Sequence, residues 1–174
     1  MPRVAAPKPR PRILIDTREQ APLRFSEAVD VEICGLVTGD YSLRGATDLV
    51  AIERKSKPDF VACCGPERER FFEQVSRLLV YPTRALVVEA TWEELAAGVY
   101  RSQINAKSVT GTVLSLIDRG LPVLLVGDAA ASSEAVERLL TRVFNRQVER
   151  AKDLLPLLLV RAGSTAPACG PHDP

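Results

Sequence analysis

The chain has 174 residues, of which 46% are hydrophobic and 26% are charged, and its formal net charge is +1. This length and composition predict one globular domain with flanking tails. The near-neutral charge excludes a strongly basic nucleic-acid-binding protein, so any nucleic-acid surface has to be local. The only histidine, His172, lies three residues from the C-terminus and excludes most histidine-based catalysis.

The termini and the cysteines narrow the class further. Residues 1–11 are rich in proline and basic residues and predict a disordered arm, and residues 156–174 predict a disordered tail around a domain at residues 12–155. The cysteines form no Cys-x-x-Cys pair, which argues against a zinc site. No apolar run is long enough to span a membrane. We expect a cytoplasmic protein, associated with the nucleoid in a prokaryote.

The first half of the chain predicts several strands. A buried strand at residues 12–16 ends in an acid, and residues 29–33 alternate like a half-exposed strand. Residues 40–43 and 49–55 predict a hairpin around residues 44–47. Ser56 follows as the N-cap of a short helix that ends at Gly65-Pro66.

The second half alternates helices with strands. We expect helices at residues 67–79 and 106–119, a short one near Glu93, and strands at residues 84–89 and 122–126. A last helix is expected to start near Ser132 or Ser133 and to end or break at Pro156. The whole order predicts an α/β domain with a central mixed β-sheet flanked by helices.

One group of charges in the predicted hairpin suggests chemistry. Alternation along a strand puts Glu53 and Lys55 on one face and Arg54 on the other. Asp40 precedes the partner strand and can approach Glu53. Two carboxylates this close repel each other unless a cation intervenes, and a hard divalent ion such as Mg²⁺ or Mn²⁺ suits oxygen ligands. A surface hairpin with unrelated charges would give the same pattern.

These residues also form a known motif. Gly39-Asp40, Glu53-Arg54-Lys55 and Asp59 together resemble the GD-(n)-ERK-x-x-x-D signature of the XPF-type structure-specific endonucleases. The upstream run of residues 15–19 resembles the Asp-x-Arg-Glu motif of that family, and residues 70–74 resemble its helix after the active site. The similarity extends over about residues 12–152.

The resemblance implies a restriction-endonuclease-like fold and a set of roles. Asp40 and Glu53 would hold the metal ion, helped by the backbone carbonyl of Arg54, and Lys55 would be the catalytic lysine. Asp16 and Glu19 would lie at the edge of the site, binding metal through water or through a second ion.

Three further residues have roles that the sequence leaves open. Arg18, like Arg54, is expected to bind phosphate or to brace the acids, and Gln74 is expected to contact substrate. Asp59 is expected either to orient Lys55 or Arg54 or simply to cap its helix.

The resemblance implies a metal-dependent DNA endonuclease that acts on branched, flapped or nicked DNA in repair or recombination. The alternative is a catalytically silent nuclease-fold subunit that binds DNA or acts as a scaffold. The chain is too short for the tandem helix–hairpin–helix motifs that follow the nuclease domain in many family members. We therefore expect a homodimer, or a nuclease-like or DNA-binding partner subunit.

Overall fold

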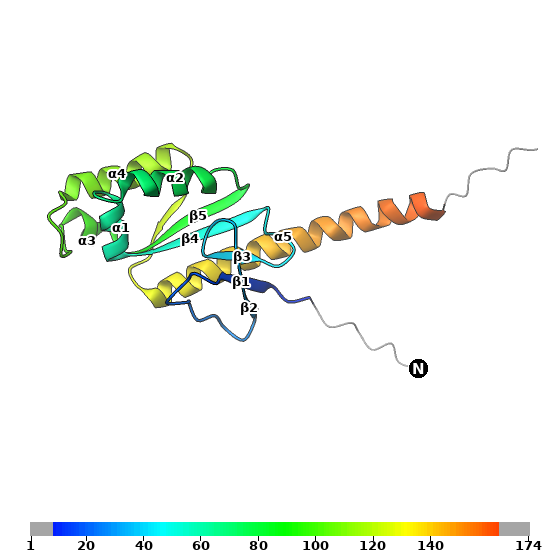
Figure 1. Ribbon diagram of the computed structural model, residues 1–174. Helices are drawn as coiled ribbons and strands as arrows, with labels where there is room; N and C mark the ends of the chain where they lie inside the picture. The colour runs from blue at the N-terminus through cyan, green and yellow to red at the C-terminus, as the bar shows by residue number, and fades with distance from the viewer. Residues whose placement is uncertain (1–8, 164–174) are drawn as a thin grey trace, which may run out of the picture.

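The computed structural model describes residues 9–163, with the side chains of residues 9–156. Its centre is one six-stranded sheet in the order β2-β1-β3-β4-β5-β6 (Figure 1). The strands are β1 (Arg12–Asp16), β2 (Asp30–Cys34), β3 (Tyr41–Leu43), β4 (Val50–Ser56), β5 (Thr83–Glu89) and β6 (Val123–Leu125). The helices are α1 (Lys57–Cys63), α2 (Arg68–Leu78), α3 (Trp92–Ala96), α4 (Ala106–Asp118) and α5 (Ala129–Gly163).

The sheet is mixed, as predicted. β3 is antiparallel to both of its neighbours, β1 and β4, whereas β1–β2, β4–β5 and β5–β6 are parallel pairs. The β4–β5 pair is in register from Val50 opposite Thr83 to Ser56 opposite Glu89. The carboxyl ends of these two strands therefore lie side by side, which brings their last side chains together.

Both faces of the sheet are covered, which explains the nearly continuous apolar runs of β4 and β5. On one face, Ala51, Leu86 and Val88 belong to a core with helices α1, α2 and α4. On the other face, Ile52 and Val87 pack in a second core with α5. Figure 1 shows the two layers, with α2 and α4 on one side of the strands and α5 crossing the other.

Two helix boundaries differ from the prediction. Helix α5 begins at Ala129 rather than near Ser132 or Ser133, because the Asp128 carboxylate accepts a hydrogen bond from Ala131 N at 2.8 Å and caps the helix earlier.

The expected end at Pro156 is wrong, since the helix continues to Gly163. Residues 151–156 are all exposed, so solvent can bond the carbonyl that proline leaves without a helical donor.

Consequently, residues 156–163 are helical and do not belong to a structureless tail. The remainder of the predicted tail, residues 164–174, and residues 1–8 of the predicted arm lie outside the described part of the chain. Residues 9–11 have no regular secondary structure, and the Pro11 carbonyl oxygen accepts a hydrogen bond from Asp30 N at 2.9 Å.

Helix α5 has two unlike parts. Val136, Leu140 and Val143 are buried against the sheet, whereas Leu154 and Leu155 are more than half exposed on the part that projects from the domain (Figure 1). Within residues 9–163, no helix is both long and apolar enough to cross a membrane.

Candidate active site

The Gly39-Asp40 step positions the first carboxylate. Gly39 has a φ of +80°, and a Cβ at this position would lie 2.9 Å from the carbonyl oxygen of Ile52 in β4. Only glycine fits this approach without strain. The close contact lets Asp40 N donate to Ile52 O at 2.8 Å, which fixes Asp40 beside the end of β4.

The Asp40 carboxylate then takes the place of a main-chain acceptor. Its Oδ2 accepts a hydrogen bond from Arg54 N at 2.8 Å, two residues beyond Ile52 on the same strand. The side chain thus extends the β3–β4 ladder after the main chains diverge. This contact holds Asp40 next to Glu53, as the sequence predicted.

Glu53 and Lys55 share one face of β4, as strand alternation predicted. Lys55 Nζ lies 2.6 Å from Glu53 Oε1, and the Glu53 side chain is 2% exposed. The second carboxylate oxygen, Oε2, is buried and has no hydrogen-bond partner. Burying an ionised oxygen without a partner costs free energy, and a bound cation or a hydrogen-bond donor would remove this cost.

The charges around Asp40 shift its titration. Burial and the negative charge of Glu53 raise the pKa of Asp40 to about 7, against a smaller opposing effect of the hydrogen bond from Arg54 N. Burial lowers the pKa of Lys55, but the charge of Glu53 and its hydrogen bond outweigh this, so the net pKa of Lys55 is raised. Lys55 therefore remains an ammonium at neutral pH.

The donor set suits a hard divalent cation. Asp40 and Glu53 provide carboxylate oxygens, and the unpartnered Oε2 of Glu53 is the atom that a cation would bind. Among the described residues, no three acidic, histidine or cysteine side chains are grouped to hold a metal ion. A cation here would therefore need backbone carbonyl or water ligands besides the two carboxylates.

The Arg54 side chain lies on the other face, where it joins two acids. Its Nε is 2.7 Å from Glu89 Oε1, and its Nη1 is 3.5 Å from Glu19 Oε1 and 3.3 Å from the Ala21 carbonyl oxygen. All three charged side chains are at most 13% exposed. The guanidinium is thus a brace, one of the two roles that the sequence suggested for it.

Glu89 is the residue of this network that the sequence analysis did not single out. Glu89 is the last residue of β5. It lies opposite Ser56, which directly follows Lys55 on the parallel strand β4. A signal was present, because a buried apolar run that ends in an acid also marks Asp16. The parallel pairing of the two strands, which links Glu89 to Arg54, was not visible in the sequence.

The Asp16 side chain has hydrogen-bond partners of its own, although Asp16 N donates to the Asp40 carbonyl oxygen at 2.8 Å. Its side chain is 2% exposed, and its oxygens accept hydrogen bonds from Leu36 N at 2.6 Å, from Arg18 N at 2.9 Å and from Arg18 Nε at 2.6 Å. The side-chain hydrogen bond from Arg18 is the main reason that the pKa of Asp16 is lowered. The structure therefore gives both Asp16 oxygens hydrogen-bond donors, from Arg18 in the same loop and from Leu36 after β2.

Asp59 occupies the first turn of α1 and bonds to the helix cap. Its Oδ2 accepts a hydrogen bond from Ser56 Oγ at 2.6 Å, while Ser56 Oγ accepts one from Asp59 N at 3.3 Å. The predicted N-cap at Ser56 is confirmed, and these contacts agree with the capping role of Asp59.

Most of the predicted residues line one cavity. This cavity of about 450 Å³ is lined by Arg18, Glu19, Asp40, Glu53, Arg54, Lys55 and Asp59, together with Cys63, Glu67 and Arg70. We call it the catalytic pocket. An adjoining cavity of about 220 Å³ shares Asp40, Glu53 and Lys55 and adds Gln74 and Arg77 of α2. Asp16 is the predicted residue that lines neither.

Comparisons with known proteins identify the family and the fold. Residues 15–139 match the ERCC4 domain. The fold is similar to that of XPF from Aeropyrum pernix in complex with DNA, with 26% identity and a TM-score of 0.60, covering 79% of this chain and 66% of that chain. A second structure of XPF from Aeropyrum pernix has 25% identity and a TM-score of 0.60, covering 89% of this chain and 76% of that one.

A search of curated proteins gave no match. The chain spans slightly less than two thirds of the DNA-bound archaeal protein. The family match nevertheless extends over most of the chain and includes the catalytic pocket, and the expected restriction-endonuclease-like fold is confirmed. The chain belongs to the ERCC4 domain family and is a nuclease domain of the XPF type.

Proposed function

We propose that the chain is a divalent-metal-dependent DNA endonuclease that hydrolyses phosphodiester bonds. The observation that carries the proposal is the buried Glu53 Oε2, which has no partner and lies in the same pocket as Asp40. Two adjacent carboxylates with an unmet oxygen are more stable with a bound cation than without one. Mg²⁺ and Mn²⁺ are the ions that this oxygen-rich set favours.

Each residue has a proposed part in the reaction. Asp40, Glu53 and the carbonyl of Arg54 would hold the ion, which when bound polarises a phosphate oxygen and acidifies a water molecule. Lys55 stays protonated beside Glu53 and offsets the negative charge that develops on the phosphate. Arg18, whose side chain is 70% exposed, reaches out to the phosphate backbone.

The second layer of the site would keep these groups in position. Arg54 braces Glu19 and Glu89, and the Asp16 carboxylate fixes Arg18 through two of its donors. Under this proposal Asp16 acts by orienting Arg18, and Glu19 acts through Arg54. Gln74, together with Arg70 and Arg77 of α2, supplies polar contacts to the substrate strand.

The proposed substrate is DNA with a branch, flap or nick, and the proposed role is in DNA repair or recombination. The similarity to an XPF protein that was solved in complex with DNA supports the choice of DNA. The chain has a small net charge, so a second copy or a nuclease-like or DNA-binding subunit would supply further DNA contacts.

A panel of flap, fork, nicked and linear DNA substrates with Mg²⁺ or Mn²⁺ tests the proposal. We expect cleavage of at least one branched or nicked substrate by the wild-type chain and none by Asp40→Asn. The matched control is Asp48→Asn, which neutralises an exposed acid in the β3–β4 turn and should leave cleavage unchanged. No cleavage of any substrate, with metal bound as measured by calorimetry, would instead identify a scaffold subunit.

A further inference from the structure

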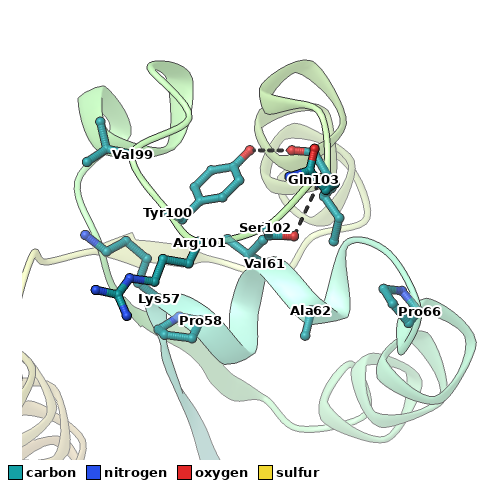
Figure 2. Close-up of a pocket in the computed structure, with 11 residues that line it drawn as sticks. Lys57, Pro58, Val61, Ala62, Pro66, Val99, Tyr100, Arg101, Ser102 and Gln103 are labelled. Atoms are coloured by element: carbon teal, nitrogen blue, oxygen red, sulfur yellow. Dashed lines mark hydrogen bonds between the residues drawn. The ribbon is translucent and has the colours of Figure 1, made fainter.

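A second cavity lies on the other side of α1. It has a volume of about 700 Å³, and its walls are mainly apolar: Pro58, Val61, Pro66, Val99, Tyr100 and Ile104. In Figure 2 the Tyr100 ring lies across the cavity from Pro58 and Val61, and the charged ends of Lys57 and Arg101 extend to the same side. We call this space the α1 cavity. Its size is that of a ligand site rather than of a packing defect.

Helix α1 separates the α1 cavity from the catalytic pocket. Asp59 and Cys63 line the catalytic pocket, whereas Pro58, Val61 and Ala62 line the α1 cavity. The two sets of residues lie on different faces of one two-turn helix. A ligand in the α1 cavity is therefore one helix diameter from the Asp40 and Glu53 carboxylates.

The wall formed by residues 99–104 is fixed by its own hydrogen bonds. Tyr100 Oη donates to the Ile104 carbonyl oxygen at 2.9 Å, and Ile104 N donates to Ser102 Oγ at 3.3 Å. Ile104 in turn fills the space above Gly65, where a Cβ would lie only 2.5 Å from Ile104 Cδ1. The cavity is thus preformed, so a ligand does not have to order this segment first.

The charges at the mouth are positive. Arg101 is exposed and takes part in none of the ion pairs formed by the described side chains. Lys57 pairs with Glu94 at 2.7 Å, but the two side chains are 26% and 35% exposed, so an incoming anion can compete for the ammonium. The mouth therefore suits a phosphate, and the interior suits an uncharged planar group.

We propose that the α1 cavity binds one unpaired nucleotide of the DNA substrate. Its base lies between the Tyr100 ring and the α1 face of Pro58 and Val61, and its phosphate contacts Arg101 and Lys57. This inference rests on the proposed function, because it assumes that DNA is the ligand. The apolar walls contact the faces of a base rather than its edges, so binding is independent of base identity.

The occupant is a nucleotide rather than a peptide because of the position of the cavity. Lys57 directly follows β4 and lies two residues beyond Lys55. Phosphates along one strand can therefore contact Lys57 and the catalytic pocket in turn. An unpaired base bound in the α1 cavity would hold its DNA strand against α1. This would favour substrates that contain single-stranded DNA next to a duplex.

Binding measured by fluorescence anisotropy in EDTA tests the inference without requiring cleavage. Flap DNAs carry a single abasic site at successive unpaired positions, in a 5′ flap in one series and in a 3′ flap in the other. We expect one position to lose affinity by about fivefold or more, as for the loss of one stacked base. The series in which this occurs identifies the flap that enters the cavity.

A double-mutant cycle then links that base to Tyr100. Tyr100→Leu should lower affinity for the intact flap by a similar factor and should not weaken binding further when the critical base is absent. Arg101→Ala should weaken binding severalfold and reduce its salt dependence. The matched control, Arg150→Ala, removes an equal exposed charge on the distal part of α5 and should have a smaller effect.

Three outcomes would overturn the inference. Additive effects of the abasic site and Tyr100→Leu would show that the base lies elsewhere. If Tyr100→Leu and Arg101→Ala both bind DNA with unchanged affinity and cleavage is intact, the nucleotide subsite is wrong but the proposed function stands. The α1 cavity would then bind a peptide or a small ligand. Absence of any DNA binding would overturn the proposed function as well. Arg101 is exposed, so Arg101→Ala remains informative even if Tyr100→Leu is unstable.

Discussion

Two corners of the molecule contain acids from different motifs of the same family, and the surroundings of these acids differ: one carboxylate is fully hydrogen-bonded and the other pair is not. The Asp16 carboxylate accepts bonds from Leu36 N and from Arg18, and its pKa is lowered. The Asp40–Glu53 corner leaves Glu53 Oε2 without a partner and raises the pKa of Asp40 to about 7. The first corner is complete without a ligand, and the second is not.

The two corners therefore differ in energetics: one carboxylate is fully hydrogen-bonded, and the other pair has an unpartnered oxygen. A satisfied buried carboxylate stabilises the fold, whereas a crowded, unsatisfied pair costs stability until a cation joins it. Variants at the two corners should therefore affect different quantities, cleavage at one and folding at the other.

The largest expected effect is on cleavage. Lys55→Ala should lower the rate of DNA cleavage by about a hundredfold to a thousandfold, because it removes the ammonium that contacts Glu53. Single-turnover cleavage measures this. Lys107→Ala, which removes an exposed ammonium from α4, is the control and should cleave at the normal rate. Equal rates in the two variants would contradict a catalytic role for Lys55.

The Asp16 corner should respond mainly in stability. Asp16→Asn should lower the free energy of unfolding at pH 7 by about 2 kcal/mol, because it weakens several hydrogen bonds to a buried carboxylate. The lowered pKa means that this stabilisation is present above the ordinary pKa of aspartate and is lost as pH falls through the lowered value. Urea unfolding at pH 7 and pH 3 measures both effects.

At pH 3 the difference between Asp16→Asn and the wild type should therefore shrink. Once folded, the variant should retain most of its cleavage activity, in contrast to Lys55→Ala. A folded Asp16→Asn protein as inactive as Lys55→Ala would make the two corners functionally equivalent.

A divalent ion should stabilise the second corner. At ten times its Kd, Mg²⁺ should add about 1.4 kcal/mol and raise the Tm by about 3–6 °C at pH 8. Glu53→Gln should abolish this shift, since it removes the charge next to the unpartnered oxygen. Differential scanning fluorimetry measures the shift, and a shift of the same size in Glu53→Gln would place the ion elsewhere.

The smallest expected effect is a pH-dependent gain in stability without metal. The pKa of Asp40 is raised to about 7, so the stability that its protonated form contributes is present at low pH and is lost as pH rises through about 7. In EDTA, Asp40→Asn should therefore be more stable than the wild type at pH 8 by about 1 kcal/mol, after allowance for solvent screening.

The difference in Tm should shrink as pH falls from about 7 towards 4, because Asp40 is protonated in the folded protein below about pH 7 but in the unfolded chain only near its ordinary pKa of 3.8. Thermal unfolding at several pH values follows the difference. A constant difference from pH 5 to pH 8 would contradict the raised pKa.

Much of the architecture followed from local patterns. Apolar runs located β1, β4 and β5, and strand alternation correctly put Glu53 and Lys55 on one face. The cap at Ser56 was also predicted, because it depends on neighbours only three residues away. Features determined within a few residues were therefore accessible from the sequence.

Features determined by distant contacts were not. The link between Arg54 and Glu89 depends on the parallel pairing of β4 with β5, and one of the hydrogen bonds to the Asp16 carboxylate comes from the Leu36 amide twenty residues away. The failed prediction at Pro156 has a different cause, since proline is least costly where solvent can bond the freed carbonyl. Exposure of that kind is a property of the folded domain.

The tight approach of Gly39 to β4 has a consequence for the evolution of such domains. Gly39 has a positive φ, and a Cβ at this position would lie 2.9 Å from Ile52 O. Both constraints come from the backbone, so they persist whether or not the Asp40 carboxylate takes part in catalysis. A relative that loses catalysis can replace Asp40 by another residue that accepts the hydrogen bond from Arg54 N, but it has to keep a glycine before it. Among silent descendants of this fold, the glycine should outlast the aspartate.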